Sequence, residues 1–207
     1  MKPILLTTLS LLLLVLPAQA AKRPEPTARQ TAAETPSATP RNPNWATLIN
    51  ADMNLYRVTP TLYRGEQFTK SEVPVLEKLG IKTSVNLRNF HDDSDELKSA
   101  SIREIRIPIN TWNIGDPKII AALAAIRRAE QQGAVLLHCQ HGADRTGLVI
   151  AMYRILYQNW SKADALDELL HGSYGHHGIL KNIPRYLKNA DIEKLRAAVD
   201  AIFAQPE

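Results

Sequence analysis

The residues best suited to chemistry lie in "HCQHGADRTG", residues 138–147, which includes the only cysteine of the chain. Five residues separate Cys139 from Arg145. A loop of this length that closes onto a helix can turn its backbone N–H groups inward and bind an anion. The planar guanidinium of Arg145 can hold two oxygens of a phosphate, and cationic surroundings favour the thiolate of Cys139. These features predict a cysteine nucleophile directed at phosphorus.

The neighbouring residues have expected roles in the same reaction. Together with Arg145, the phosphate cradle is expected to comprise Gln140, His141, Gly142, Ala143 and Asp144. Thr146 is expected to donate its hydroxyl to the thiolate, and His138 to hydrogen-bond the loop backbone. Taken singly, Thr146 and His138 are better explained as satisfied polar residues of the core, and a lone cysteine as a small buried hydrophobic residue. The combination of neighbours favours the catalytic interpretation.

The elements around this stretch are those that must position it. "AVLLH" is short and apolar, which predicts a central strand, and "TGLVIAMYRILYQ" has the apolar content of a buried helix. Upstream, the pattern predicts two short strands within 54–67, a helix over 71–79, strands over 81–88 and 102–109, and a helix from Asp116 to about 132. Two or three further helices are predicted to complete the chain.

This order of elements predicts an α/β fold, with a small central parallel or mixed sheet flanked by helices in one domain, residues 45–207. In such sheets ligands bind beyond the carboxyl ends of the strands. The stretch 138–147 begins at the carboxyl end of one of these strands, so its position agrees with its chemistry.

The first 44 residues have a different composition. Residues 1–20 combine a lysine, a short apolar run and "AQA", which predicts a cleaved signal peptide. Residues 21–44 are rich in Pro, Thr and Ala, which predicts a disordered tether. We therefore expect a periplasmic or otherwise exported protein that is soluble after cleavage. Most of the net charge of +4 lies in these two segments, so a nucleic-acid-binding face is not expected.

The pattern His-Cys-x5-Arg-Thr-Gly resembles the signature of the protein tyrosine and dual-specificity phosphatases. "LYRGEQ" (62–67) and "SVNLR" (84–88) are similar to segments of a compact, atypical branch of that family. The resemblance covers about residues 50–190. It implies hydrolysis of phosphomonoesters through a phosphocysteine on Cys139, phosphate binding by Arg145 and stabilisation of the thiolate by Thr146. It implies no metal and no organic cofactor.

The resemblance also implies a general acid, usually an aspartate upstream of the cysteine. Within residues 107–138 the only aspartate is Asp116, which is therefore the predicted acid, although Asp-Pro at a helix start is also explained by capping. Asp144 is the alternative acid, unless it merely holds the loop in position. Asp92 and Asp93 are weaker candidates in a segment that we interpret as a solvated loop.

Substrate contacts are predicted for Arg88, His91 and Trp112, which lie near strand ends or the loop. "GSYGHHG" (172–178) is interpreted as a flexible loop near the site mouth rather than as a metal site. The loop 139–145 lacks lysine, which favours phosphotyrosine, with a phosphorylated protein, and in particular a periplasmic region of a membrane protein, as partner. The alternatives are a phosphoinositide or inositol-phosphate phosphatase, a rhodanese-type sulfurtransferase and a non-catalytic phosphate-binding module.

Overall fold

A computed structural model describes residues 41–205 of the chain, so the predicted signal peptide and most of the predicted tether lie outside the described residues. Six strands form a mixed sheet in the order β1-β2-β3-β6-β4-β5. They are β1 (Thr47–Asn50), β2 (Leu55–Arg57), β3 (Leu62–Gly65), β4 (Ile81–Asn86), β5 (Arg103–Arg106) and β6 (Ala134–His138). β6 lies between β3 and β4 and is parallel to both, which confirms that "AVLLH" is the central strand.

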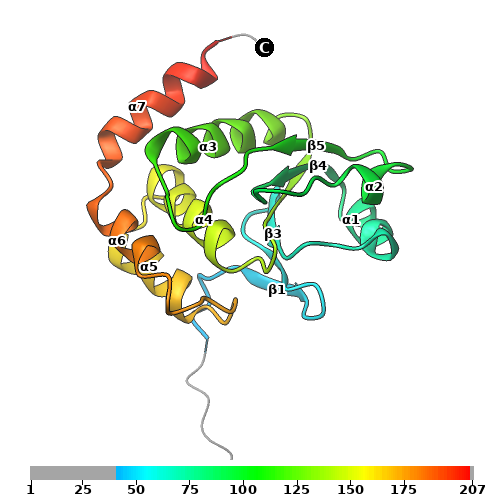
Figure 1. Cartoon of the computed structure of the whole chain (residues 1–207), viewed down its shortest axis with the longest axis horizontal. Coiled ribbons are helices and arrows are strands. Elements are labelled where there is room, and N and C mark those ends of the chain that lie inside the picture. Colours follow the sequence, from blue (N-terminus) through cyan, green and yellow to red (C-terminus); the bar gives the residue numbers. More distant parts are fainter. Residues whose placement is uncertain (1–40, 206–207) are drawn as a thin grey trace, which may run out of the picture. The chain divides into compact units, whose positions relative to one another are not determined.

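Seven α-helices and one 3₁₀ turn surround the sheet. They are the 3₁₀ turn Lys70–Glu72, α1 (Val73–Lys78), α2 (Ser94–Leu97), α3 (Asp116–Glu130), α4 (Asp144–Gln158), α5 (Lys162–His171), α6 (Asn182–Asn189) and α7 (Ile192–Phe203). Figure 1 shows α3 and α4 on one side of the strands and α1 and α2 on the other. The predicted α/β fold with a mixed sheet flanked by helices is therefore confirmed.

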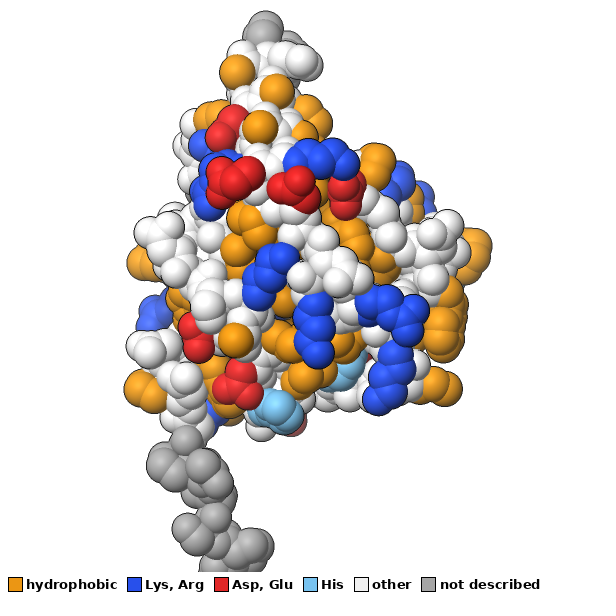
Figure 2. All heavy atoms as spheres, turned by 90° about the vertical axis from the view of Figure 1, so that its left-hand side faces the viewer, with side chains coloured by type: hydrophobic (Ala, Val, Ile, Leu, Met, Phe, Trp, Pro, Cys, Tyr) orange, Lys and Arg blue, Asp and Glu red, His pale blue; other side chains and the backbone are white. Residues whose placement is uncertain are grey.

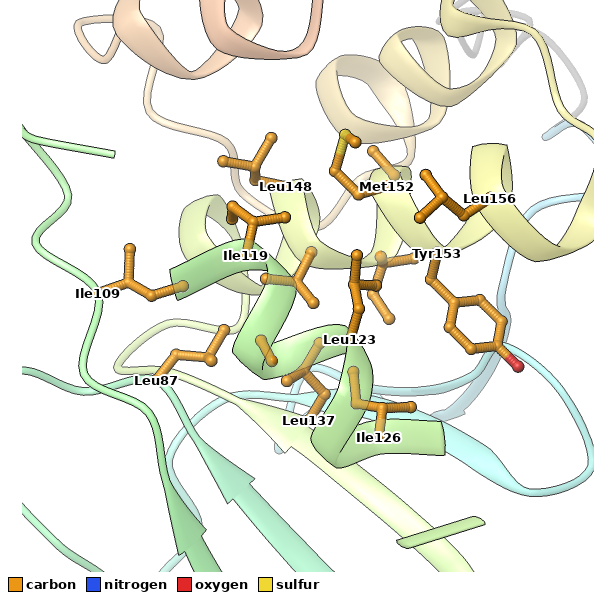
Figure 3. Close-up of a cluster of buried hydrophobic side chains, with 14 of the residues drawn as sticks. Leu87, Ile109, Ile119, Leu123, Ile126, Leu137, Leu148, Met152, Tyr153 and Leu156 are labelled. Atoms are coloured by element: carbon orange, nitrogen blue, oxygen red, sulfur yellow. The ribbon is translucent and has the colours of Figure 1, made fainter. Parts of the chain in front are cut away.

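The alternation of side chains along β6 supplies both halves of the core. Val135 and Leu137 face the larger apolar cluster, which contains residues of α3 and α4, whereas Leu136 faces the smaller cluster beside α1. Figure 3 shows Leu123 and Ile126 of α3 packed toward Leu137 of the larger cluster. The two clusters cover both faces of β6, and this fixes the strand whose carboxyl end carries the cysteine loop.

The structure differs from the sequence-based expectation in one additional strand and at the start of one helix. β1 was not predicted, because "TLIN" is an edge strand whose residues are exposed or half-buried and show no apolar alternation. The N-cap of α3 is Gly115, and Asp116 is the first helical residue, followed by Pro117. Asp116 therefore does not have the capping position expected for it.

Arg41 lies within the segment predicted to be a tether, yet it contacts the folded part of the chain. Its guanidinium donates to the carbonyl oxygens of Ala46 and Gly172 at 2.7 and 3.0 Å and to the Tyr174 hydroxyl at 2.8 Å. The packed part of the chain thus includes residue 41. None of the helices in residues 41–205 is both long and apolar enough to span a bilayer.

Candidate active site

The loop that follows β6 carries the cysteine to the N-terminus of α4. Cys139 is 2% exposed, and α4 begins five residues later at Asp144. The first N–H groups of a helix have no partner within the helix, so they are free to bind an anion at this point. Cys139, Asp144 and Arg145 line one cavity of about 280 Å³, which is also bounded by His141 and His177. The structure therefore brings the predicted nucleophile and the predicted phosphate-binding arginine together.

The shape of the loop depends on a close approach to the end of β3. Gly142 has φ +66°, and a Cβ atom at this position would lie 2.5 Å from the carbonyl carbon and oxygen of Gly65. Only glycine accepts both this backbone conformation and this contact. The Gln67 N–H also donates to the Gln140 carbonyl at 3.2 Å, so two contacts hold the loop against the chain that follows β3.

Arg64, on β3, places a buried cation behind the loop. Its Nη2 donates to the Gly142 carbonyl at 2.7 Å, and its guanidinium carbon lies 3.5 Å from the centre of the Tyr174 ring. Nε and Nη1 have no hydrogen-bond partner among the described residues. Burial lowers the pKa of Arg64, and attraction to Tyr174, Glu168 and Cys139 acts in the opposite direction. The side chain thus contributes positive charge on the side of the loop away from solvent.

Glu168 and Asn54 support this arrangement. Glu168 is buried and accepts from Arg154 Nε and Nη2, both at 2.9 Å, and from the Tyr174 hydroxyl at 2.9 Å. Burial acts to raise the pKa of Glu168, but the hydrogen bond and charge of Arg154 outweigh it and lower that pKa. The Asn54 amide donates to the carbonyl oxygens of His141 and Tyr174 at 2.8 and 3.0 Å, which links the loop to the segment after α5.

Asp93 is buried on the opposite side of the loop and is not part of a solvated segment, so the interpretation of this residue from the sequence was wrong. Its Oδ1 accepts from Asn86 Nδ2 at 3.1 Å and from Arg88 Nη2 at 2.9 Å. Its Oδ2 accepts from Ser84 Oγ at 2.8 Å and from His138 Nε2 at 2.9 Å. A buried carboxylate keeps its charge only when donors of this kind surround it.

The same donors determine the ionisation of Asp93. Burial acts to raise its pKa, but the hydrogen bond and charge of His138, together with Ser84 and Arg88, hold the pKa below its ordinary value. Because Asp93 has no exposed surface and does not line the cavity of Cys139, it cannot act as a general acid toward a bound substrate. Asp92, by contrast, is exposed and accepts from the Ser94 backbone N–H at 3.1 Å.

Arg145 is held by Leu87, the residue that follows β4. Its Nη1 donates to the Leu87 carbonyl at 3.3 Å, and the Leu87 N–H donates to the His138 carbonyl at 2.9 Å. A second cavity, of about 360 Å³, is lined by Arg145 together with the predicted substrate contacts, Arg88, His91 and Trp112, and with Gln140. The structure therefore gathers these residues around Arg145, although the Arg88 guanidinium turns inward toward Asp93.

Thr146, the predicted partner of the thiolate, is fully buried at the start of α4. Its hydroxyl has no hydrogen-bond partner among residues 41–205. An unsatisfied buried hydroxyl costs free energy unless a partner is supplied, and a thiolate on the neighbouring loop is such a partner.

Asp144 lies at the mouth of the Cys139 cavity and is held by the segment predicted to be a flexible loop. The His177 N–H and Nδ1 lie 3.0 and 2.6 Å from its two oxygens. His176 Nδ1 lies 2.9 Å from Oδ1 but is not aligned for a hydrogen bond. His177 is half exposed and lies 5.3 Å, centre to centre, from the His141 ring. "GSYGHHG" thus forms part of the site mouth.

Asp116 occupies a different cavity, and the structure does not bring it together with Cys139. The Tyr186 hydroxyl donates to its Oδ1 at 2.9 Å, and Lys194 Nζ lies 3.2 Å from its Oδ2. This cavity, of about 500 Å³, also includes Trp112 and Arg185. Figure 2 shows the side of α6 and α7, where basic, acidic and apolar side chains are interspersed.

Three residues that support the site were not given that role from the sequence: Arg64, Asp93, which was only a weaker candidate acid, and His177, which was only part of the loop placed near the site mouth. Arg64 did leave a signal, because a charged residue interrupts the otherwise apolar pattern of "TLYRG". Asp93 left none, since it stands among other acidic residues in a polar segment. Within residues 41–205, no group of three or more His, Cys, Asp or Glu side chains is arranged to hold a metal ion.

Comparison with known proteins gives a consistent result. The model of the dual specificity phosphatase catalytic domain matches residues 62–185. The chain is 39% identical over 168 residues to the dual specificity protein phosphatase TpbA of Pseudomonas aeruginosa (strain UCBPP-PA14), a match that covers 81% of this chain and 76% of TpbA.

Solved structures agree with the sequence comparison. A crystal structure of P. aeruginosa TpbA matches with a TM-score of 0.72 and 37% identity, covering 77% of this chain and 98% of that one. A structure of a TpbA variant in complex with pTyr matches with a TM-score of 0.73 at the same identity and coverage. The catalytic core of the PP-IP phosphatase SIW14 of S. cerevisiae, at 22% identity and a TM-score of 0.60, covers 74% of this chain and 96% of its own, and shows the shared fold alone.

Proposed function

The chain belongs to the dual specificity phosphatase family, and from this premise we propose that it is an exported phosphotyrosine phosphatase that works through a phosphocysteine on Cys139. Its enzyme class, protein-tyrosine and dual-specificity phosphatase, follows from the family. The observation that supports the mechanism is the meeting of Cys139, Arg145 and the N-terminus of α4 around one cavity. Nucleophile, bidentate cation and backbone donors then converge on a single phosphate.

In the first step the Cys139 thiolate attacks the phosphorus of the ester. The S–P bond forms as the P–O bond to the leaving group breaks, and the leaving oxygen takes up a proton from the general acid. The loop N–H groups and Arg145 stabilise the charge on the equatorial oxygens, where it is concentrated in the transition state.

In the second step water attacks the phosphocysteine. The P–O bond to water forms, the S–P bond breaks with its electrons returning to sulfur, and the conjugate base of the acid accepts a proton from the water. The Thr146 hydroxyl, which has no other hydrogen-bond partner in the described part of the chain, donates to the departing thiolate. Inorganic phosphate is released and the Cys139 thiolate is restored.

Asp144 is the general acid that the site supports best. It lines the cavity of Cys139 and Arg145, and His177 at the mouth can pass it a proton. Asp116, the acid predicted from the sequence, is held by Tyr186 and Lys194 in another cavity and requires a movement of the segment before α3 to reach the site. Asp116 therefore stays a second candidate.

The proposed substrate is phosphotyrosine in a protein. The solved complex of the TpbA variant with pTyr supports this choice, since 37% of the aligned residues are identical. Phe90 and Trp112, which are 85% and 67% exposed beside the Arg145 cavity, offer apolar surface to an aromatic ester. Inositol phosphates and phosphoinositides remain the alternative class. The proposal also includes a membrane protein as the partner and an export signal in residues 1–20. The export signal lies outside the described residues.

Leaving groups of different basicity separate the two candidate acids. An enzyme that loses its general acid slows most on esters whose leaving oxygen needs a proton. We expect Asp144→Asn to lower kcat for phenyl phosphate by about 100-fold while p-nitrophenyl phosphate is affected far less. Asp116→Asn is expected to lower both equally and only slightly. The reverse pattern would assign the acid to Asp116.

Two controls test the rest of the proposal. Cys139→Ser is expected to abolish turnover of both esters, and residual turnover at the wild-type rate would exclude the phosphocysteine. A folded, reduced wild type that binds phosphate but hydrolyses neither ester would instead be a phosphate-binding module. Phosphotyrosine peptide, phosphoserine peptide and phosphoinositide, compared by kcat/KM, then decide the substrate class.

A further inference from the structure

Asp93 is a charged residue that the reaction proposed above does not use. It is 0% exposed, and four side chains, those of Ser84, Asn86, Arg88 and His138, donate to its two oxygens. A carboxylate has room for about four such hydrogen bonds, so Asp93 is saturated. The chain therefore maintains a fully buried negative charge near its active site without exposing it to substrate.

One side of this network leads to the nucleophile. The Asp93 Oδ2 atom lies 2.9 Å from Nε2 of His138, the residue that directly precedes Cys139. A carboxylate only accepts hydrogen bonds, so Nε2 carries the ring proton. Nδ1 of the same ring lies 3.3 Å from the Cys139 carbonyl oxygen. Asp93 thus fixes the orientation of the His138 ring and requires a proton on Nε2. The Cys139 carbonyl also only accepts, so its contact with Nδ1 is a hydrogen bond only when Nδ1 carries a proton as well.

The other side leads to the phosphate-binding arginine. The Asp93 Oδ1 atom holds Asn86 and Arg88, which also contact each other, since the Arg88 N–H donates to Asn86 Oδ1 at 2.8 Å. Leu87, between them, accepts from Arg145 Nη1 at 3.3 Å. Asp93 therefore fixes the residues on both sides of the carbonyl that holds the Arg145 guanidinium.

We propose that Asp93 is a positioning residue that keeps Cys139 and Arg145 in register, through His138 on one oxygen and the segment 86–88 on the other. The proposal rests on the proposed phosphatase function, because it concerns the same site. A positioning role for Asp93 differs from a purely structural role in one respect. If Asp93 positions the nucleophile, turnover must depend on which nitrogen of the His138 ring is protonated, and not only on the packing of that ring.

Asparagine at position 93 tests this requirement with little change of shape. Asn86 Nδ2 and Arg88 Nη2 can only donate, so the amide oxygen of the variant must face them. The amide NH₂ then faces Ser84 and His138. The serine hydroxyl can rotate to accept, and His138 can accept only by moving its proton from Nε2 to Nδ1. Asp93→Asn therefore keeps the hydrogen bonds to Asn86 and Arg88, which support Arg145. It changes the hydrogen bond to His138, which supports Cys139.

The experiment compares Asp93→Asn with Asp95→Asn in the protein that comprises residues 21–207. Asp95 is an exposed aspartate two residues away from Asp93. The ¹⁵N spectrum of the His138 ring is expected to show protonation at Nε2 in the wild type and at Nδ1 in Asp93→Asn. We expect kcat for p-nitrophenyl phosphate to fall about 10–100-fold, as for other residues that orient a catalytic group, with KM changed less than about twofold. Asp95→Asn is expected to leave kcat, KM and the spectrum unchanged.

Two results would overturn the proposal. The first is a proton that moves to Nδ1 in a folded Asp93→Asn whose kcat equals that of the wild type. The second is a wild-type His138 protonated at Nδ1 alone, which needs no variant and so applies even if Asp93→Asn does not fold. Wild-type turnover and its loss in Cys139→Ser are measured in parallel, so failure of the phosphatase function itself is recognised separately.

Discussion

On the β4 side of the phosphate-binding loop Asp93 accepts four hydrogen bonds, whereas on the β3 side Arg64 makes one. We call the first group (Ser84, Asn86, Arg88, Asp93, His138) the Asp93 cluster and the second (Arg64, Gly142, Glu168, Tyr174) the Arg64 cluster. In the Asp93 cluster nearly every polar group has a partner, so it fixes geometry. In the Arg64 cluster a buried guanidinium has two nitrogens without a hydrogen-bond partner among residues 41–205, so its main contribution is charge.

The difference between the two clusters explains how the phosphate-binding loop can be both rigid and electropositive. Saturated hydrogen bonds hold atoms in place but leave no net field, because each charge is compensated nearby. A cation with few partners gives a field, at a cost in desolvation. Dividing the two tasks between opposite sides of the loop avoids having one residue do both. The predictions below test whether the two clusters differ in this way.

The largest effect is expected where the Arg64 cluster meets the loop. In Gly142→Ala, the new Cβ would lie 2.5 Å from the Gly65 carbonyl in a backbone conformation that favours glycine. The loop must shift, and a displacement of about 1 Å at a reacting group costs about 100-fold in rate. We expect kcat/KM to fall by that factor. Gly178→Ala, where a Cβ would meet nothing within 4 Å, is the matched control.

Arg64→Met comes next and separates charge from geometry. The variant keeps an unbranched buried side chain but removes the cation behind the loop, so kcat/KM and the affinity for inorganic phosphate are expected to fall about tenfold. The melting temperature is expected to change little, because a largely unpartnered buried charge is replaced by an apolar group. Arg57→Met, on the exposed side of the adjacent strand, should alter neither quantity. A large drop in stability without a change in phosphate affinity would contradict the comparison.

Acid should weaken both clusters through their carboxylates. Asp93 and Glu168 have folded-state pKa values below their ordinary ones, so each adds stability above its unfolded pKa, about 3.9 for Asp and 4.3 for Glu. That stability is lost as the pH falls through the folded-state pKa. We expect about 1.4 kcal/mol of unfolding free energy to be lost for each unit of depression, measured by urea unfolding between about pH 6 and pH 2.

Variants assign this acid sensitivity to its source. Glu168→Gln and Asp93→Asn should each flatten the dependence of stability on pH, since neither variant can be protonated there. Arg64→Met should leave most of the slope, because arginine stays charged throughout this range. An unchanged slope in both carboxylate variants would show that other groups cause the acid sensitivity.

The smallest effect is expected at Asn54, which joins the Arg64 cluster to the loop by two neutral hydrogen bonds. Asn54 has φ +44°, so glycine removes the amide without straining the backbone. We expect Asn54→Gly to lower kcat/KM about two- to threefold, mainly through KM, because His141 at the rim is less firmly held. A loss of kcat/KM as large as that of Arg64→Met would contradict the comparison. It would mean that the two hydrogen bonds of Asn54, and not the charge of Arg64, are the main support of the loop on the β3 side.

The sequence predicted the parts of this site that are local in the chain. Cys139, Arg145, the central strand and the helix after the loop all lie within 25 residues, and their spacing alone indicated a phosphate site. The supports were not predictable in the same way. Arg64 and Gly142 are 78 residues apart, and Asp93 and His138 are 45 apart, so only the sheet order brings them together.

The general acid illustrates the same limit. Asp116 was predicted because it is the only aspartate within residues 107–138, upstream of the cysteine. Its position in the fold depends on contacts with Tyr186 of α6 and Lys194 of α7, which no local pattern indicates. Asp144 could be judged only once His177, 33 residues downstream, was seen beside it.

Trp112 lines three cavities: that of Cys139, the second cavity lined by Arg145, and that of Asp116. The other two tryptophans of the chain, Trp45 and Trp160, lie under the guanidinium groups of Arg41 and Arg154, whereas Trp112 is 67% exposed. Its indole is therefore a built-in fluorophore at the entrance of the site. The contribution of this residue to the total tryptophan emission should report arrival of an aromatic phosphate, or a shift of the segment before α3, in real time and without any label.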